Sequence, residues 1–172
     1  EQILSSHSQI DGTLELPNIL AYVQELNGRK YKHKAARYPA ILSELDGDTL
    51  SALGQRYLKE TQVHRQQGDF FIDKMPNNFR HIGLIKSILP HAKIIDTRRQ
   101  PMSCCFSVFK QLFAEGQEFS YSFEDIVAYY QGYQDLMAHW HAVYPNEILT
   151  VEYETLVSSP TDTIEEVFAY LG

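Results

Sequence analysis

The chain has 172 residues, of which 44% are hydrophobic and 22% charged, and its formal net charge is −7. This length suits a single domain with a sizeable hydrophobic core. The excess of 22 acidic over 15 basic residues argues against a nucleic-acid-binding protein, because such proteins usually present a basic surface. The most apolar segment is interrupted by Lys86 and stopped by Pro90, which excludes a membrane-spanning helix in this chain.

The first residues predict a helix already under way, since Ile3 and Leu4 lie among polar residues and no methionine precedes them. The last residues end at a helix terminus. We therefore expect a piece of a longer protein. Residues 17–27 predict a short helix, with a proline near its start and Gly28 as its stop. Residues 28–47 are mixed and basic, and they read as a loop.

The next segment predicts a helix that Asp48 caps and that ends at Gly68. Residues 69–73 form a short apolar run between a glycine and polar residues, which suits a buried strand. Residues 78–89 carry apolar side chains at helical spacing, and the proline that follows them terminates this helix.

The second half of the chain repeats the alternation of strand and helix. Residues 92–96 predict a strand, and residues 101–115 a helix that starts at a proline. Ser122, with an acidic residue three positions later, resembles a capping box for a long helix to Val143. Residues 147–153 predict a third strand, and a serine–proline pair opens the final helix. This order predicts an α/β fold with a parallel sheet flanked by helices.

Metal and disulfide chemistry find little support in the sequence. Cys104 and Cys105 are neighbours, so on a helix they point in different directions, and neither a disulfide nor a zinc site is expected. His139 and His141 are two positions apart on a helix and point away from each other, so we do not expect them to bind a metal ion together. His81 is expected to be a surface or hydrogen-bonded histidine. Reduced thiols favour a cytoplasmic location.

Ligands of open parallel α/β sheets bind outside the carboxyl ends of the strands. Lys74 follows the first predicted strand, Arg98 and Arg99 follow the second, and Tyr153 ends the third. This edge should therefore attract a phosphate or a sulfate. Lys74 could equally be a solvated loop lysine, and Tyr153 a half-buried strand residue.

Arg99 is followed by Pro101 and then by Ser107, which lies on one helix face with Ser103. A guanidinium fork and a helix hydroxyl together suit a terminal phosphate. Two alternatives stay open: a surface ion pair between Arg99 and a nearby carboxylate such as Asp96, and a helix-packing role for Ser107.

These motifs, in this order, resemble the PAPS-dependent sulfotransferases, where PAPS is 3′-phosphoadenosine 5′-phosphosulfate. The similarity rests on Lys74-Met75-Pro76, on Arg-x-Pro-x5-Ser at residues 99–107, and on "VEYETLVSSP" with its following helix. The segments "DKMPNNF" and "YYQGYQDLMAHW" look most like the tyrosylprotein sulfotransferase-like branch, including bacterial members that follow helical (TPR) repeats. The resemblance implies a P-loop-like three-layer α/β domain over residues 1–172, incomplete at both ends: the phosphosulfate loop and a C-terminal basic segment would lie outside it.

The resemblance also implies roles for single residues. Glu15 falls at the position of the catalytic glutamate, and Lys74 at that of a catalytic lysine. Arg99 and Ser107 match the 3′-phosphate motif, and Tyr153 matches a tyrosine that contacts the nucleotide. PAPS is then the sulfuryl donor, no metal is needed, and the partner is a hydroxyl acceptor: a peptide tyrosine, a carbohydrate or a small molecule.

Other interpretations remain open beside this one. Glu15 could be a carboxylate that favours a helix start. A P-loop small-molecule kinase and a non-catalytic nucleotide-binding module are the alternative functions, and a homodimer is an open alternative for the assembly. A location in the Golgi lumen would suit an animal enzyme of the tyrosylprotein type.

Overall fold

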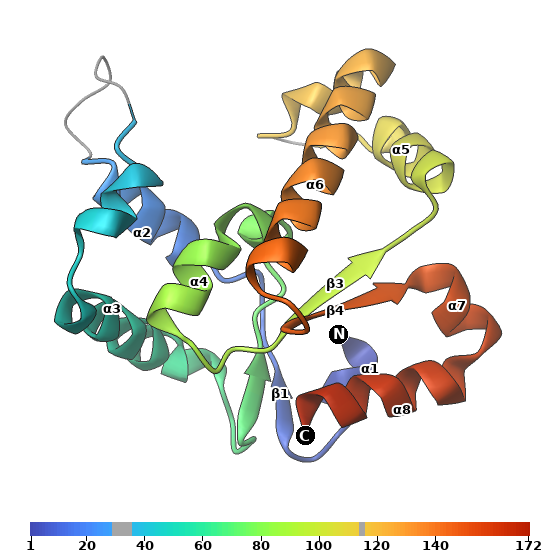
Figure 1. Cartoon of the computed structure of the whole chain (residues 1–172). Helices are drawn as coiled ribbons and strands as arrows, with labels where there is room; N and C mark the ends of the chain where they lie inside the picture. Colours follow the sequence, from blue (N-terminus) through green and yellow to red (C-terminus); the bar gives the residue numbers. More distant parts are fainter. Residues whose placement is uncertain (29–35, 114–115) are drawn as a thin grey trace. The chain divides into compact units, whose positions relative to one another are not determined.

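The computed structural model describes residues 1–28, 36–113 and 116–172. The chain forms two compact units, Glu1–Ala92 and Lys93–Gly172. In each unit, helices alternate with short parallel strands, as the α/β prediction expects (Figure 1).

The first unit contains one small parallel sheet among its helices, of which those labelled η are 3₁₀ helices. In chain order its elements are α1 (Gln2–Ser5), β1 (Ile10–Gly12), α2 (Asn18–Leu26), η1 (Ala40–Glu44), α3 (Gly47–Glu60), η2 (Thr61–His64), β2 (Phe70–Ile72), η3 (Pro76–His81) and α4 (Ile82–Ile88). β1 pairs with β2 in parallel, with Ile10 opposite Phe70 and Gly12 opposite Ile72. The buried apolar side chains of this unit are Ile10, Leu16, Ile19, Tyr22, Ile41, Tyr57, Ile82, Leu84, Ile85 and Ile88.

Helices α3 and α4 approach each other closely at Gly54. A Cβ atom at this position would lie 2.0 Å from the carbonyl oxygen of Ile88, which is far inside van der Waals contact. Only glycine therefore permits this helix packing.

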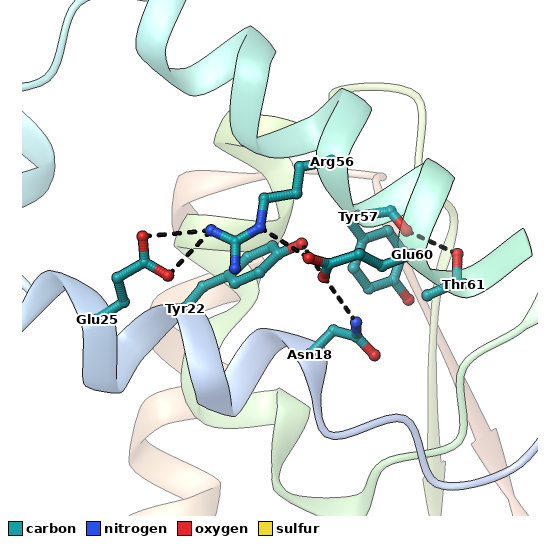
Figure 2. A network of polar contacts seen from close by, with 7 residues as sticks. All are labelled: Asn18, Tyr22, Glu25, Arg56, Tyr57, Glu60 and Thr61. Atoms are coloured by element: carbon teal, nitrogen blue, oxygen red, sulfur yellow. Dashed lines mark hydrogen bonds and ion pairs between the residues drawn. The ribbon is translucent and has the colours of Figure 1, made fainter.

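Helices α2 and α3 are joined by a polar network (Figure 2). The Arg56 guanidinium lies 2.9 Å from Glu25 and 2.8 Å from Glu60, and the Tyr22 hydroxyl donates a hydrogen bond of 2.8 Å to Glu60. The Tyr22 ring is buried under this network, since only 1% of its surface is exposed. The network therefore aligns α2 on α3.

The second unit is built on a longer parallel pair of strands. Its elements are β3 (Ile94–Arg98), α5 (Pro101–Lys110), η4 (Glu118–Tyr121), α6 (Phe123–Val143), β4 (Ile148–Glu152), α7 (Tyr153–Ser158) and α8 (Pro160–Leu171). β3 pairs with β4 in parallel, from Ile94 opposite Ile148 to Arg98 opposite Glu152. α5 packs beside α6, where the rings of Phe109 and Phe123 stack with centroids 3.9 Å apart. The buried apolar residues of this unit are Ile126, Met137, Ile148 and Val151.

The prediction of three strands is wrong, because the described residues include the further strand β1 (Ile10–Gly12). The helix expected at the start of the chain ends at Ser5. The side chains of Ser5 and Ser6 hydrogen-bond to carbonyl groups three residues earlier, which competes with helix propagation. The chain is then free to enter β1.

Two helix starts test the capping predictions. Ser122 caps α6 as predicted, since its hydroxyl accepts a hydrogen bond from the Asp125 N–H. The prediction that Asp48 caps α3 is wrong: Asp46 does so, with its carboxylate 2.8 Å from the Thr49 N–H. Asp48 lies inside the first turn, where its charge also suits the helix dipole.

Other boundaries differ from the predictions. The predicted loop at 28–47 contains η1, whose Ile41 is buried, while residues 29–35 of that loop lie outside the described residues. The helix predicted to reach residue 115 ends at Lys110; residues 114–115 are likewise outside the described part. Tyr153 starts α7 rather than ending a strand.

None of the helices in the described residues has the length and apolar character needed to cross a bilayer.

The close contact at Gly54 predicts that Gly54→Ala destabilises the first unit. The added methyl group must push α3 away from the Ile88 carbonyl, and we expect the free energy of unfolding to fall by about 1–3 kcal/mol. Gly132→Ala in α6 is the control. A Cβ there meets nothing within 4 Å, so this substitution should stabilise by up to about 1 kcal/mol. Urea unfolding measures both, and equal stability of the Gly54→Ala variant would contradict the packing.

The buried His81 predicts a loss of stability in acid. His81 is 7% exposed and its Nδ1 lies 3.1 Å from the Tyr38 hydroxyl; burial lowers the pKa of this imidazole from 6.5 to about 4. Below pH 6.5 the His81 side chain binds a proton in the unfolded chain but stays neutral in the folded chain until the pH approaches 4. The free energy of unfolding should therefore fall, by at most about 1.4 kcal/mol per pH unit, until the pH approaches 4.

The measurement compares urea unfolding at about pH 7.5 and about pH 5 for the wild type and for His81→Gln. The variant, which has no imidazole, should lose less stability between the two pH values. An equal loss of stability in both proteins would show that His81 is not the cause of the acid destabilisation.

Candidate functional site

The parallel pairing of β1 and β2 brings Glu15 and Lys74 together. Gly12 and Ile72 end the two strands side by side, so the segments that follow leave the sheet at the same edge. The Thr13 hydroxyl donates a hydrogen bond to the Ile72 carbonyl and ties the two strand ends. Beyond them, Lys74 Nζ donates a hydrogen bond to Glu15 Oε1 at 2.8 Å.

This charged pair is open to solvent, with 51% of the Glu15 side chain and 48% of the Lys74 side chain exposed. Leu16 is almost fully buried and anchors the residue before it. Glu1 Oε2 lies 4.0 Å from Lys74 Nζ and adds negative charge. The hydrogen bond from Lys74 to Glu15 raises the pKa of Lys74, so the ammonium form persists at neutral pH. A half-exposed pair stabilises a fold little; it is accessible to a ligand instead.

The structure bears on the alternative interpretations of Lys74, as a solvated loop residue, and of Glu15, as a carboxylate at a helix start. Lys74 is not only solvated, because it contacts Glu15 directly. Glu15 precedes α2, which begins at Asn18, but it faces Lys74. The sequence placed Lys74 at a strand end, whereas it gave no sign that Glu15 would pair with it. The catalytic roles of both stay predictions.

In the second unit, a buried carboxylate fixes Arg98 at the end of β3. Asp96 Oδ2 accepts a hydrogen bond of 2.7 Å from Arg98 Nε, and Asp96 Oδ1 accepts one of 2.7 Å from the Tyr133 hydroxyl. Only 8% of the Asp96 side chain is exposed. Because residues two apart on a strand share a face, Asp96 selects Arg98, and the alternative of an Arg99–Asp96 ion pair is wrong.

Arg99 is therefore left at the surface beside an aromatic ring. Its guanidinium carbon lies 5.3 Å from the centre of the Tyr153 ring, within reach of a cation–π interaction. Within residues 1–28, 36–113 and 116–172, Arg99 forms no ion pair with a carboxylate. Its charge is thus available for an anion.

Helix α5 begins two residues after Arg99, with Pro101 as its first residue. Glu154, the neighbour of Tyr153, accepts a hydrogen bond of 3.1 Å from the backbone N–H of Gln100 and so ties this turn to α7. Ser107 lies in the middle of α5 and is exposed. The structure thus brings Arg99 and Tyr153 together and places Ser107 on the helix that follows Arg99.

Metal chemistry finds no candidate in the described residues, where no group of three or more His, Cys, Asp or Glu side chains could hold an ion. The Asp96–Arg98–Tyr133 cluster was missed by the sequence analysis. Its one available signal was the Asp-x-Arg spacing, which puts opposite charges on one face of a strand.

Comparisons with known proteins agree with the motifs. A protein-family model described as "Sulfotransferase family" matches residues 1–172, the full chain. The chain is also similar to an "Uncharacterized protein" of Aquifex aeolicus (strain VF5), with 28% identity over 179 residues, which cover 99% of this chain and 23% of that protein. The chain therefore spans about a quarter of the length of this relative.

Proposed function

The chain belongs to the sulfotransferase family, and on this premise we propose that it transfers a sulfuryl group from PAPS to a hydroxyl acceptor. The observation that carries the proposal is the pair of Glu15 and Lys74, 2.8 Å apart at an exposed edge of parallel strands. The P-loop-like three-layer fold, the single domain over residues 1–172 and the tyrosylprotein-like branch belong to this proposal. The acceptor class, the cytoplasmic location and a homodimer stay predictions from the sequence.

In sulfuryl transfer the acceptor oxygen bonds to sulfur while the bond from sulfur to the 5′-phosphate oxygen of PAPS breaks, which releases 3′-phosphoadenosine 5′-phosphate. The step needs a base for the acceptor proton and positive charge where negative charge develops on the leaving phosphate and the sulfuryl oxygens. Glu15 is the base in our proposal: its half-exposed carboxylate can accept a proton from a bound hydroxyl. Lys74 supplies the charge: a lysine is an ammonium ion at neutral pH, and the hydrogen bond with Glu15 raises its pKa further above the usual range. The hydrogen bond of 2.8 Å between them places the base and the positive charge side by side.

Arg99, Ser107 and Tyr153 would hold the donor. A guanidinium fork binds phosphate through two hydrogen bonds, and Arg99 is exposed without a described carboxylate partner. Ser107 adds a hydroxyl donor, and the half-exposed Tyr153 ring offers a surface for the nucleotide. These residues fit an anionic nucleotide, and PAPS supplies the sulfuryl group when bound.

Calorimetric titration of the full-length protein distinguishes this proposal from its alternatives. Tight binding of 3′-phosphoadenosine 5′-phosphate and weak binding of ADP would support a sulfotransferase. A preference for ADP would favour the small-molecule kinase. Binding of the 3′-phosphorylated nucleotide without any transfer would favour a non-catalytic nucleotide-binding module.

The phosphate role of Arg99 predicts a loss of nucleotide affinity in Arg99→Ala. Because a charged, bidentate contact is removed, the dissociation constant of 3′-phosphoadenosine 5′-phosphate should rise by about tenfold to a hundredfold. Lys110→Ala, which removes an exposed cation from the other end of α5, is the control and should change the affinity little. Calorimetry measures both, and equal binding by the Arg99 variant would refute the assignment.

The base role of Glu15 predicts a loss of turnover in Glu15→Gln. The amide keeps the shape but cannot accept the proton, so kcat should fall by about 10²–10⁴-fold while nucleotide affinity stays close to that of the wild type. Glu44→Gln is the control, because Glu44 is also an exposed carboxylate in an ion pair, with Arg37 at 3.3 Å. Steady-state kinetics decide, and unchanged kcat in Glu15→Gln would exclude this base.

A further inference from the structure

Asp73 lies between the end of β2 and Lys74, and both of its carboxylate oxygens are engaged. Asp73 Oδ2 accepts a hydrogen bond of 2.7 Å from the Tyr57 hydroxyl, and Asp73 Oδ1 accepts one of 3.1 Å from the Met75 backbone N–H. The bond from Met75 to Asp73 joins the two residues that flank Lys74, and the bond from Tyr57 ties Asp73 to α3. They therefore fix the backbone turn that carries the lysine.

Tyr57 is a rigid anchor for this turn. Its side chain comes from α3 and is only 3% exposed, and its ring stacks on Phe71 of β2 with centroids 6.2 Å apart. Burial, followed by the neighbouring Asp73 charge, raises the pKa of the Tyr57 hydroxyl, which therefore stays a hydrogen-bond donor. α3 is itself fixed by the close contact between Gly54 and the Ile88 carbonyl.

The lysine alone could not keep this geometry. Lys74 has a long side chain that is half exposed, and an ion pair in such a setting holds two side chains only weakly. A fixed backbone narrows the directions that the side chain can take, and Glu15 lies in one of them.

We propose that Tyr57 and Asp73 are positioning residues that hold Lys74 against Glu15. The inference deepens the proposed function, on which the role of Lys74 in transfer rests. Neither residue needs to touch a substrate: Tyr57 acts through Asp73, and Asp73 acts through the turn that bears Lys74.

The test uses Tyr57→Phe, Asp73→Ala and Asp73→Asn in the full-length protein, with Tyr22→Phe as a matched control. Tyr22 is also a buried tyrosine that donates to a carboxylate, Glu60 at 2.8 Å, but that bond joins α2 to α3 (Figure 2). Asp73→Asn is the conservative variant, because its amide can still accept from the Met75 N–H and can donate to the Tyr57 oxygen.

The first readout needs no activity. The rate at which acetic anhydride modifies Lys74 is followed by mass spectrometry, with the exposed Lys59 as internal reference. Release of Lys74 from Glu15 should raise its relative rate severalfold in Tyr57→Phe and Asp73→Ala. Tyr22→Phe and Asp73→Asn should stay near the wild type.

The second readout is kinetic. In Tyr57→Phe and Asp73→Ala, kcat should fall by about tenfold or more with little change in the KM for the donor, because a displaced catalytic group costs turnover rather than binding. In a Lys74→Ala background, Tyr57→Phe should have no further effect on kcat, since its effect passes through the lysine.

Unchanged labelling of Lys74 in both Tyr57→Phe and Asp73→Ala would overturn the inference, whatever the activity. An equal increase in Tyr22→Phe would also overturn it, because the effect would then be a general loosening of the unit. If Tyr57→Phe does not fold, the comparison of Asp73→Ala with Asp73→Asn decides. If the variants show the expected labelling of Lys74 but the wild-type protein transfers no sulfuryl group, the proposed function is refuted and the positioning role stands.

Discussion

The parallel pairing of β1 with β2 determines where the charged side chains of the first unit meet. Each of these strands has only three residues, yet their register sets Gly12 beside Ile72, and the Thr13 hydroxyl bonds the Ile72 carbonyl just beyond. The segments bearing Glu15 and Lys74 therefore leave the same sheet edge. A slip of one residue would turn every side chain of a strand to its other face.

In the second unit, one of two adjacent arginines is bound within the fold and the other stays exposed to a ligand. Asp96 and Tyr133 hold Arg98, because it lies two residues beyond Asp96 on the same face of β3. Arg99 follows the strand and lies beside Tyr153. One arginine thus stabilises the strand end, while its neighbour offers an exposed charge to an anion. In the first unit, likewise, Asp73 and Tyr57 support Lys74 without joining its ion pair.

Sequence patterns predicted much of the fold because most of its helices have clear start or stop signals, such as a capping serine or a proline. Ser122 caps α6, prolines open α5 and α8, and the strands before Lys74 and Arg99 were recognisable as short apolar runs. β1 was missed because three residues are too short to show an alternation. Within the site, the residue types at the strand ends were predictable. The pairings were not: the choice of Arg98 over Arg99 by Asp96, the contact of Glu15 with Lys74 and the bond from Tyr57 to Asp73 all depend on tertiary packing.

The most direct measurement of the central claim is the transfer of radiolabelled sulfuryl groups from PAPS by the full-length protein. The acceptors would be a tyrosine-containing peptide, a carbohydrate and a small phenol, each with its hydroxyl-blocked counterpart. Our account predicts a labelled sulfate ester on at least one free hydroxyl and none on the blocked forms. It would be contradicted by a protein that binds neither PAPS nor 3′-phosphoadenosine 5′-phosphate, or that labels hydroxyls from the γ-phosphate of ATP instead.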